Sequence, residues 1–595
     1  MQLETITKEL SQRLQEALRV SDHRKAHVAS VTSSSIDHRL SPLHHEDSAR
    51  SVTSHPALAA LRTPKVVTPP VGAQGERSSA TTQSSNYFSL TAVTLSSSPR
   101  DVLITSTTAS TKAGSSHFGK KASLEETRPR PPPPQSLRHT TGPLFEHQPF
   151  IVSWNIPDLV CNRYKISLDT SPFKGVATPA KVPGQFLSLF YTDRLGLYPH
   201  VDQTSRKQLY GGIPQRGNLR ASMTKARADV NYYIPSRTSR GLAVIDWEEW
   251  RPLWDRNWGN KRIYQTLSVA HVMQTNPSLT LQQATEKAKQ QFQLAARSLM
   301  SGMLAMGRAM RPNYLWGFYL FPNCYNYGWL EPGYTGRCSR EVRRQNDELL
   351  WLWEASTALY PSVYLQAALA DNPRAALMVR NRVQEALRVS TLPRRSATAP
   401  VFVYMRPVFV DQNRRFLSQG DLVSTIGESA AVGASGAVLW GASADYDDQA
   451  SCKSLSSYLS STLNPYITNV TAAAQLCSNF LCQGNGRCVR KNYNSNHYLH
   501  LNPDSFRVMH VQNRYLVLGK PTFADLRTLS RRFTCQCYKG LSCTPPRTYS
   551  ELTKALTFSG KQGLHQKAHI LNKAVLDDTQ QASITKDNVK KNLKV

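Results

Sequence analysis

The 595-residue chain is long enough for more than one folded region, because single hydrophobic cores rarely grow beyond about 250–300 residues. It carries 72 Lys and Arg against 41 Asp and Glu, a formal net charge of +31 that favours a polyanionic partner. No zinc-finger spacing, phosphate-binding Gly-rich loop or aromatic RNA-binding motif accompanies this charge, so nucleic acid is not the expected partner. An acidic polysaccharide fits the composition better.

The first 142 residues have the composition of a disordered extension. They are rich in Ser, Thr, His and Pro and lack sustained apolar periodicity. Neither a signal peptide nor a mitochondrial transit peptide is recognisable at the start. The heptapeptide QEALRVS at 15–21 recurs at 384–390. We therefore hypothesise that residues 1–142 are a fused or mis-joined upstream segment, a gene-model artefact, and that the authentic start with its signal peptide is missing.

Residues 143–470 alternate strand-like apolar runs with helical patterns. The clearest helix is predicted at 281–310, and strands are predicted at 150–155, 187–191, 241–246, 315–321, 362–365, 401–410 and 437–440. Such alternation indicates a parallel sheet, and seven or eight such units indicate a closed (β/α) barrel. Active-site groups of a barrel lie at the C-terminal ends of its strands.

Residues 241–254, GLAVIDWEEWRPLW, join a buried strand to a pair of acids. Because side chains alternate along a strand, Asp246 and Glu248 are expected to project together from its end. Two carboxyl groups this close in a partly dehydrated cleft do not both ionise readily, so one is expected to keep a proton and act as a general acid, as glycoside cleavage requires. The alternative is a strand end whose acids are solvated or paired with Arg251. The neighbouring aromatic residues favour the catalytic interpretation: Trp247, Trp250 and Trp254.

Further segments complete the pattern in order along the chain. They read FYTDRLGLYP (190–199), GGIPQ (211–215), LWGFYLFPNCYNY (315–327), STALYPSVYL (356–365), STIGESAAVGASGAVLWG (424–441) and CSNFLCQGNGRCVR (477–490). With the acid pair, they resemble the animal hyaluronidases, glycoside hydrolase family 56, over about residues 145–545. The vertebrate lysosomal, cell-surface and sperm-type members are the most similar. The resemblance implies an α/β fold, a distorted (β/α) TIM-type barrel with a C-terminal EGF-like disulfide-rich module behind the disordered N-terminal extension.

The resemblance also implies a role for each candidate site residue. Glu248 would protonate the glycosidic oxygen and then activate water as a base. Asp246 would share a proton with Glu248 and orient the acetamido group of the substrate, whose own carbonyl attacks the anomeric carbon. Tyr319 and Tyr364 would position that group, and Trp440 would line its pocket. Taken without the resemblance, these three aromatic residues would be core residues.

Three other positions are expected to bind the substrate, two that match groove residues of the family and one that departs from its pattern. Tyr198 and Arg382 would face the substrate, with Arg382 meeting a glucuronate carboxylate; without the resemblance, Arg382 would be a solvated helix residue. Where many members read FPDCYN, this chain reads FPNCYN at 321–326, so that Asn323 replaces a carboxylate. An amide keeps hydrogen bonds but holds no charge, so Asn323 is expected to alter the pKa of Glu248 and the pH optimum.

Ten cysteines without a C-x-x-C pair predict disulfides in an oxidising compartment rather than a zinc or thioredoxin-like site. Cys161 follows the first core strand and Cys452 the last, so a Cys161–Cys452 bridge would fasten the beginning of the domain to its end. A Cys324–Cys338 bridge would close a loop beyond another strand. The resemblance implies EGF-like pairing of the other six: Cys477–Cys488, Cys482–Cys535 and Cys537–Cys543.

The expected module occupies residues 471–545, and the long spacing before Cys535 predicts an insertion at 489–534 with strands of its own. The basic tail, 546–595, shows no transmembrane span or glycolipid-anchor (GPI) signal and is expected to be solvated and flexible, with a second contact to polyanion as the alternative. Asn469, in Asn-Val-Thr, is an N-glycosylation acceptor. The disulfides and this acceptor predict an extracellular or lysosomal protein.

The resulting prediction is an endo-acting hydrolase of hyaluronan that cleaves the β-1,4 bond after N-acetylglucosamine with retention. Chondroitin is a further candidate substrate. No metal or cofactor is expected, and a monomer is expected. The alternative is a catalytically weak hyaluronan-binding or adhesion protein. Asn323 and the cysteine-rich insertion are compatible with that alternative, whereas the intact pair of Asp246 and Glu248 favours an enzyme.

Overall fold

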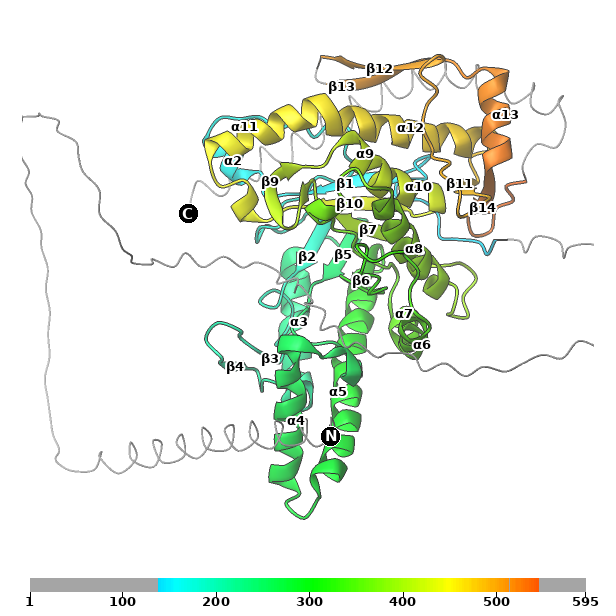
Figure 1. Cartoon of the computed structure of the whole chain (residues 1–595). Coiled ribbons are helices and arrows are strands. Elements are labelled where there is room, and N and C mark those ends of the chain that lie inside the picture. The colour runs from blue at the N-terminus through cyan, green and yellow to red at the C-terminus, as the bar shows by residue number, and fades with distance from the viewer. Residues whose placement is uncertain (1–136, 513, 545–595) are drawn as a thin grey trace, which may run out of the picture. The chain divides into compact units, whose positions relative to one another are not determined.

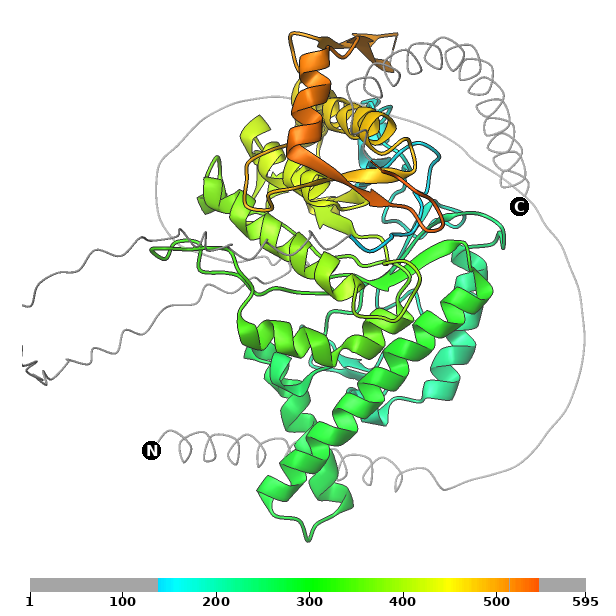
Figure 2. The same ribbon diagram turned by 90° about the vertical axis from the view of Figure 1, so that its right-hand side faces the viewer.

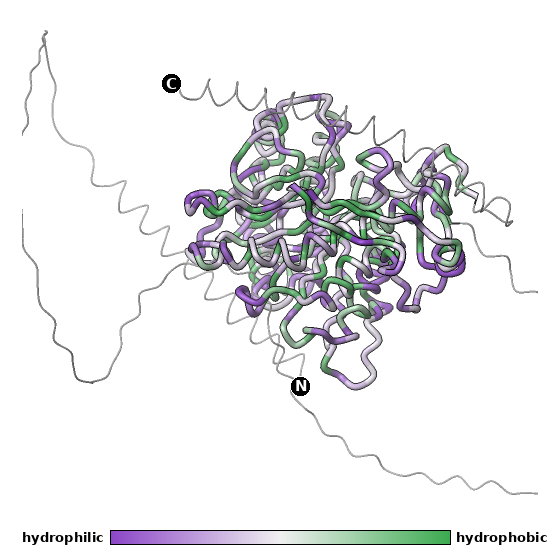
Figure 3. Tube along the Cα trace, turned by 90° about the horizontal axis from the view of Figure 1, so that it is seen from above, coloured by the Kyte–Doolittle hydropathy of each residue, from purple (hydrophilic) through white to green (hydrophobic). Residues whose placement is uncertain are grey.

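The structure, a computed structural model, describes residues 137–512 and 514–544 (Figure 1). The expectations for residues 1–136 and for the basic tail from residue 545 therefore lie outside the described residues. Hydrophobic segments cross the interior of the described part, and hydrophilic segments lie around its edge (Figure 3).

Two parallel sheets of three strands form the centre. The first has the order β2 (Leu187–Phe190), β5 (Gly241–Ile245) and β6 (Tyr314–Phe318). The second has the order β1 (Ile151–Asn155), β10 (Gly436–Trp440) and β7 (Phe402–Met405). All residues of β1, β2, β5 and β7 are buried, which explains why these strands are predominantly apolar in the sequence rather than alternating with exposed polar residues.

A segment without regular strand structure links the two sheets. Its parallel bridges run from Tyr360 to Tyr319 beyond β6, and from Leu359 and Ser362 to the β7 side. The strand predicted at 362–365 is not formed, and the pairing residues lie earlier, at 359–362. Pro361 interrupts the ladder within this segment, because it has no N–H to donate. Its carbonyl still accepts a hydrogen bond from Tyr404 N at 2.8 Å.

The strand predicted at 401–410 is divided in the same way. Pro407 separates β7 from β8 (Val408–Phe409), which pairs with β9 (Gln412–Phe416) in an antiparallel hairpin. The short helices of the catalytic region are α2 (Leu159–Arg163), α6 (Arg340–Glu348), α7 (Leu350–Ala355), α9 (Gln419–Leu422), α10 (Glu428–Val432) and α11 (Gln449–Tyr458). A small hairpin is formed by β3 (His200–Val201) and β4 (Gln208–Leu209).

Longer helices pack around the sheets: α3 (Leu219–Tyr233), α4 (Arg262–Thr275), α5 (Leu281–Met310) and α8 (Pro373–Ser390). The helix predicted at 281–310 is confirmed as α5. Thr280 and Gln283 form a reciprocal capping box at its start, which satisfies backbone N–H groups that the first turn leaves unpaired. α4 and α5 lie side by side and extend away from the sheets (Figures 1 and 2).

The C-terminal part begins with α12 (Asn464–Leu481) and an antiparallel pair, β11 (Gly486–Arg490) and β14 (Phe533–Cys537). Between that pair lie the hairpin of β12 (Phe506–Val511) and β13 (Arg514–Gly519) and helix α13 (Phe523–Arg532). α12 continues without a break across the boundary expected at residue 470. The folded part also begins earlier than residue 143, because buried Thr140 bridges to Thr398 and Tyr538.

Five disulfides join the ten cysteines, and they are the same five pairs that the sequence analysis expected. Cys161–Cys452 joins α2, which follows β1, to α11, which follows β10. The other four are Cys324–Cys338, Cys477–Cys488, Cys482–Cys535 and Cys537–Cys543.

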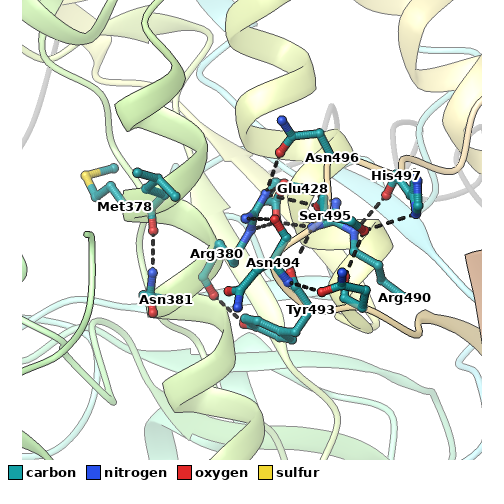
Figure 4. Close-up of polar contacts among 12 residues, drawn as sticks. Met378, Arg380, Asn381, Glu428, Arg490, Tyr493, Asn494, Ser495, Asn496 and His497 are labelled. Carbon is teal, nitrogen blue, oxygen red and sulfur yellow. Dashed lines mark hydrogen bonds and ion pairs between the residues drawn. The ribbon is translucent and has the colours of Figure 1, made fainter. Parts of the chain in front are cut away.

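A buried carboxylate connects the catalytic core to the C-terminal part (Figure 4). Glu428 of α10 is fully buried, and its Oε1 accepts a hydrogen bond from Arg380 Nε of α8 and another from Arg490 Nη1 of β11, each at 2.7 Å. The two arginines also donate to backbone carbonyls of the loop after β11, Arg380 to Asn494 O at 2.9 Å and Arg490 to His497 O at 2.7 Å. These bonds fix the loop against α8 and α10.

Candidate active site

Three candidate side chains follow directly after the strands of the first sheet. The last residues of these strands are in register, Phe190 beside Ile245 and Ile245 beside Phe318. The next residue of each strand is therefore at the same level: Tyr191, Asp246 and Tyr319. Backbone hydrogen bonds extend the ladder to this level, from Asp246 N to Phe190 O at 2.8 Å and from Tyr319 N to Ile245 O at 2.9 Å. The C-terminal edge of the sheet thus carries a carboxyl group between two tyrosines.

Three aromatic side chains, Tyr319, Tyr364 and Trp440 of the second sheet, lie next to one another and form an aromatic wall. Trp440 is the last residue of β10, and its Nε1 donates to Tyr191 Oη at 3.0 Å. The ring of Tyr364 stacks on that of Trp440 at 6.2 Å between centroids and 15° between planes. The ring of Tyr319 lies 6.3 Å from that of Tyr364. The structure therefore brings together Tyr319, Tyr364 and Trp440, which the sequence placed at strand ends.

The two acids of the motif differ in exposure. Burial and then the nearby Glu248 carboxylate raise the pKa of Asp246 well above its ordinary value. Among the described residues, Asp246 Oδ1 is buried and has no hydrogen-bond partner. The Glu248 side chain is 39% exposed. One carboxyl is therefore dehydrated while the other is open to a substrate.

Two cationic side chains donate hydrogen bonds to the backbone carbonyl of Glu248. Arg251 Nη1 and Lys261 Nζ each donate to Glu248 O at 2.6 Å, and Lys261 Nζ also donates to Glu249 O at 3.2 Å. The Arg251 Nη2 atom lies 3.7 Å from Glu248 Oε2, so the expected alternative of an Arg251 pair exists only as a long contact. Burial and then the charge of Arg251 lower the pKa of Lys261 to about 8.

Tyr198 and Arg382 are both buried, and their contact with the substrate stays a prediction. Tyr198 is fully buried, and its ring stacks on that of Trp247 with 4.5 Å between centroids. Arg382 is 5% exposed and donates from Nε to Asn326 Oδ1 at 2.8 Å and from Nη1 to Ser362 O at 3.0 Å. The ring of Tyr198 and the guanidinium group of Arg382 therefore both have neighbours inside the protein.

Two further predicted positions have local partners. Asn323 is 8% exposed, and its Oδ1 accepts a hydrogen bond from Tyr325 N at 2.8 Å, so the amide shapes the turn after β6. Its effect on the pKa of Glu248 stays a prediction. Asn469 lies half-buried in α12, where its Oδ1 accepts from Leu501 N at 3.1 Å. The oxygen, not the nitrogen that would carry a glycan, makes this bond.

Three residues of the site were missed in the sequence. Tyr191 and Asn155 are the final residues of two predicted strands, so the rule that barrel sites lie at strand ends could have identified them. Tyr404 lies inside β7. Burial, then neighbouring tyrosines and Asp246, raise the pKa of Tyr404. Its Oη and both amide atoms of Asn155 are buried without hydrogen-bond partners within the described chain, so they are available to a ligand.

The arrangement combines a carboxyl pair that shares a proton, an aromatic wall and buried polar atoms without partners. Such a site can transfer a proton to a leaving oxygen and hold the apolar face and amide of a sugar. Within residues 137–512 and 514–544, no group of three or more His, Cys, Asp or Glu side chains is placed to hold a metal ion.

Comparison with known proteins identifies the family. The hyaluronidase family profile matches residues 139–547. The chain is 47% identical over 411 residues to hyaluronidase PH-20 of Macaca fascicularis, covering 69% of this chain and 80% of that protein. It is 46% identical over 412 residues to hyaluronidase PH-20 of Homo sapiens, with the same coverage. It is 43% identical over 413 residues to hyaluronidase-1 of Bitis arietans, covering 68% of this chain and 92% of that protein.

Among solved structures, bee venom hyaluronidase is similar, with 29% identity, a TM-score of 0.48 and coverage of 54% of this chain and 99% of that one. A second structure of the bee venom enzyme, with a hyaluronic acid tetramer, has the same identity and TM-score and covers 98% of that chain. The profile match over residues 139–547 and the relatives at 43–47% identity show that the chain belongs to the hyaluronidase family of glycoside hydrolases.

Proposed function

We propose that Asp246 and Glu248 carry out the hydrolysis of hyaluronan, the activity that membership of the hyaluronidase family gives to this chain. Family membership supports hydrolysis rather than the binding-only alternative. The observation that carries the assignment is the pairing of a buried Asp246, whose pKa is raised by burial and by Glu248, with a Glu248 side chain that is 39% exposed. A carboxyl pair of unequal hydration can hold one proton and deliver it to a substrate.

The proposed reaction has two steps. Glu248 first gives its proton to the glycosidic oxygen while the acetamido carbonyl oxygen of the substrate attacks the anomeric carbon and the bond to the leaving sugar breaks. Glu248, now a carboxylate, then takes a proton from a water molecule that attacks the same carbon and reopens the ring formed by the acetamido group. Two displacements at one carbon leave its configuration retained.

The other residues of the site position the acetamido group. The Oδ1 atom of Asp246, which has no hydrogen-bond partner among the described residues, would accept the acetamido N–H and hold the carbonyl toward the anomeric carbon. Tyr319, Tyr364 and Trp440 would form the pocket for this group, with Trp440 fixed through its hydrogen bond to Tyr191. Tyr191 would belong to the same site, because its hydroxyl accepts the hydrogen bond from Trp440, and because burial and then the nearby Asp246 carboxyl raise the pKa of that hydroxyl.

The remaining expectations extend the proposal to the whole chain. The two sheets and the segment at 359–362 would close a distorted (β/α) barrel, and the three disulfides after residue 476 would form an EGF-like module around the β12, β13 and α13 insertion. Disulfides require an oxidising compartment, which supports the secretory pathway. The protein would act as a monomer, with chondroitin as a second substrate.

The test is Glu248→Gln, with Glu249→Gln as the matched control on the next residue. The amide keeps the shape of Glu248 but has no proton to donate, so reducing-end release from hyaluronan should fall 10²–10⁴-fold or more while polymer binding is kept. The control should stay within a few-fold of the parent. Turnover by Glu248→Gln close to that of the control would remove Glu248 from the role of general acid.

A further inference from the structure

The hairpin of β12 and β13 has two unlike faces. One face packs against α12, and Phe506 and Val517 contact the core there. His510 and Tyr515 pair across the strands on that same face, and Tyr515 Oη donates to Ser460 O at 3.3 Å. Since side chains alternate along a strand, the intervening residues form the opposite face. Figures 1 and 2 show this hairpin at the periphery of the described protein.

The opposite face is apolar and exposed. Directly paired residues share a face, and Met509 pairs with Leu516, Arg507 with Leu518, and Val511 with Arg514. Four of these side chains are apolar and between 40% and 46% exposed: Met509, Val511, Leu516 and Leu518. A solvated sheet face normally carries polar side chains, so an apolar face of this kind indicates a binding surface. We call these six residues the hairpin face.

The surroundings of the hairpin face are basic. The segment between Cys488 and Cys535 contains eight Lys and Arg and two Asp and Glu. One of the two acids, Asp525, is occupied internally, because it accepts hydrogen bonds from Asn502, Ser505 and Thr522. The exposed cations of this segment include Lys520, which directly follows β13, and three arginines of α13: Arg527, Arg531 and Arg532.

We propose that the hairpin face docks on an anionic lipid surface. Lipid offers an apolar layer for Met509, Leu516 and Leu518 and negative headgroups for Arg507 and Arg514 of the same face, which is the combination that interfacial segments use. A second copy of the chain would bring Arg507 and Arg514 toward like charges. A polysaccharide anion would bind the arginines and leave the apolar side chains in water. No helix in the described ranges is long and apolar enough to cross a membrane, so this contact would be peripheral.

The test is sedimentation of the full chain with vesicles. Vesicles of phosphatidylcholine with about 30 mol% phosphatidylserine should retain the protein, and pure phosphatidylcholine should retain it far less, because the contact is partly electrostatic. Met509→Ser/Leu516→Ser should lower the partition coefficient about tenfold, and Arg507→Gln by a smaller factor that shrinks with added salt. The matched control is Leu294→Ser, which removes a 67% exposed leucine from α5 and should change nothing.

Turnover of a short, soluble hyaluronan fragment by Met509→Ser/Leu516→Ser should equal that of the parent, which shows that this variant folds and that the surface is separate from the site. Three results would overturn the proposal. The first is a vesicle partition coefficient that is unchanged in Met509→Ser/Leu516→Ser, or that is equal for neutral and anionic vesicles. Sedimentation velocity could show a dimer that Leu516→Ser dissociates. Arg507→Gln could weaken hyaluronan binding without affecting vesicles, which would assign the surface to polysaccharide.

Discussion

The two carboxyl groups of the site differ chiefly in how much water reaches them. Asp246 follows β5 directly and continues its ladder, so its side chain begins inside the protein. Glu248 lies two residues later, where the chain has left the sheet, and its side chain is 39% exposed. The same spacing that projects both acids from one strand end therefore gives them unequal hydration.

This asymmetry predicts that Asp246→Asn raises the stability of the fold at pH 7 and lowers hyaluronan hydrolysis. Because the folded-state pKa of Asp246 lies above its ordinary value of 3.8, its contribution to stability is lost as pH rises from 3.8 through the folded-state pKa. The amide does not titrate, so the variant should have a higher thermal midpoint than the parent at pH 7 and a similar one near pH 3.5. Hyaluronan hydrolysis should fall about 10²-fold or more. A lower midpoint at pH 7 would contradict the argument.

Lys261 predicts a second pH effect. Its ammonium group donates to Glu248 O and Glu249 O, and its pKa is lowered to about 8 by burial and by Arg251. Below pH 8 the charged group holds the backbone of the general acid, and above it these bonds weaken. Lys261→Met should lower kcat about tenfold to 10²-fold through misplacement of Glu248, with little change in KM.

The pH profile separates this positioning role from a merely structural one. The parent should lose activity as pH rises through about 8, whereas Lys261→Met should lack that limb. The matched control is Lys289→Met, whose ammonium pairs with Asp255 on the exposed side of α5. If Lys261→Met lost activity above pH 8 as the parent does, that loss would be due to the titration of another group.

The strand pattern was predictable to within one or two residues for β1, β2, β5 and β10. β5 and β10 are continuous apolar runs, and Asp246 and Trp440 follow from where those runs end. Burial of single aromatic or basic residues was not predictable. Tyr198 and Arg382 are side chains that suit either a groove or an interior, and only the packing of Trp247 and Asn326 against them decides.

Contacts between distant elements were the least predictable part. Glu428 bonds to Arg380 and Arg490 across 48 and 62 positions of sequence, and nothing local to any of the three indicates a buried ion cluster. Buried carboxylates need such partners, because an ion without compensation in a low dielectric is costly. The cluster joins α8, α10 and β11, so three elements depend on one side chain.

Glu428→Gln is therefore expected to destabilise the fold strongly. It leaves two arginines buried with less compensation, which typically costs about 3–5 kcal/mol. Urea unfolding should show the loss as a lower midpoint. The matched control is Glu348→Gln, which breaks an exposed pair with Arg344 and should change stability by less than about 1 kcal/mol. Equal effects of the two variants would show that the cluster does not connect the core to the loop after β11.

At the scale of the whole molecule, contacts between the beginning and the end of the described chain hold the site together. The two strands β1 and β10 pair in parallel, and their last residues, Asn155 and Trp440, belong to the site. A helix beyond each strand contains one cysteine of the disulfide, α2 beyond β1 with Cys161 and α11 beyond β10 with Cys452. The disulfide therefore joins the two chain segments that leave the sheet beside the aromatic wall, 291 positions apart in sequence.

Loop length predicts which disulfide matters most for stability. In the chain-entropy model, closing a loop of 291 residues restricts the unfolded chain by about 6 kcal/mol and closing one of 6 residues by about 2 kcal/mol. Cys161→Ala/Cys452→Ala should therefore lower the thermal midpoint more than Cys537→Ala/Cys543→Ala. Well below its midpoint the first variant should still hydrolyse hyaluronan, because the β1 and β10 ladder remains. Equal midpoints for the two variants would show that native-state strain or residual unfolded structure, rather than loop closure, sets the contribution of these bonds.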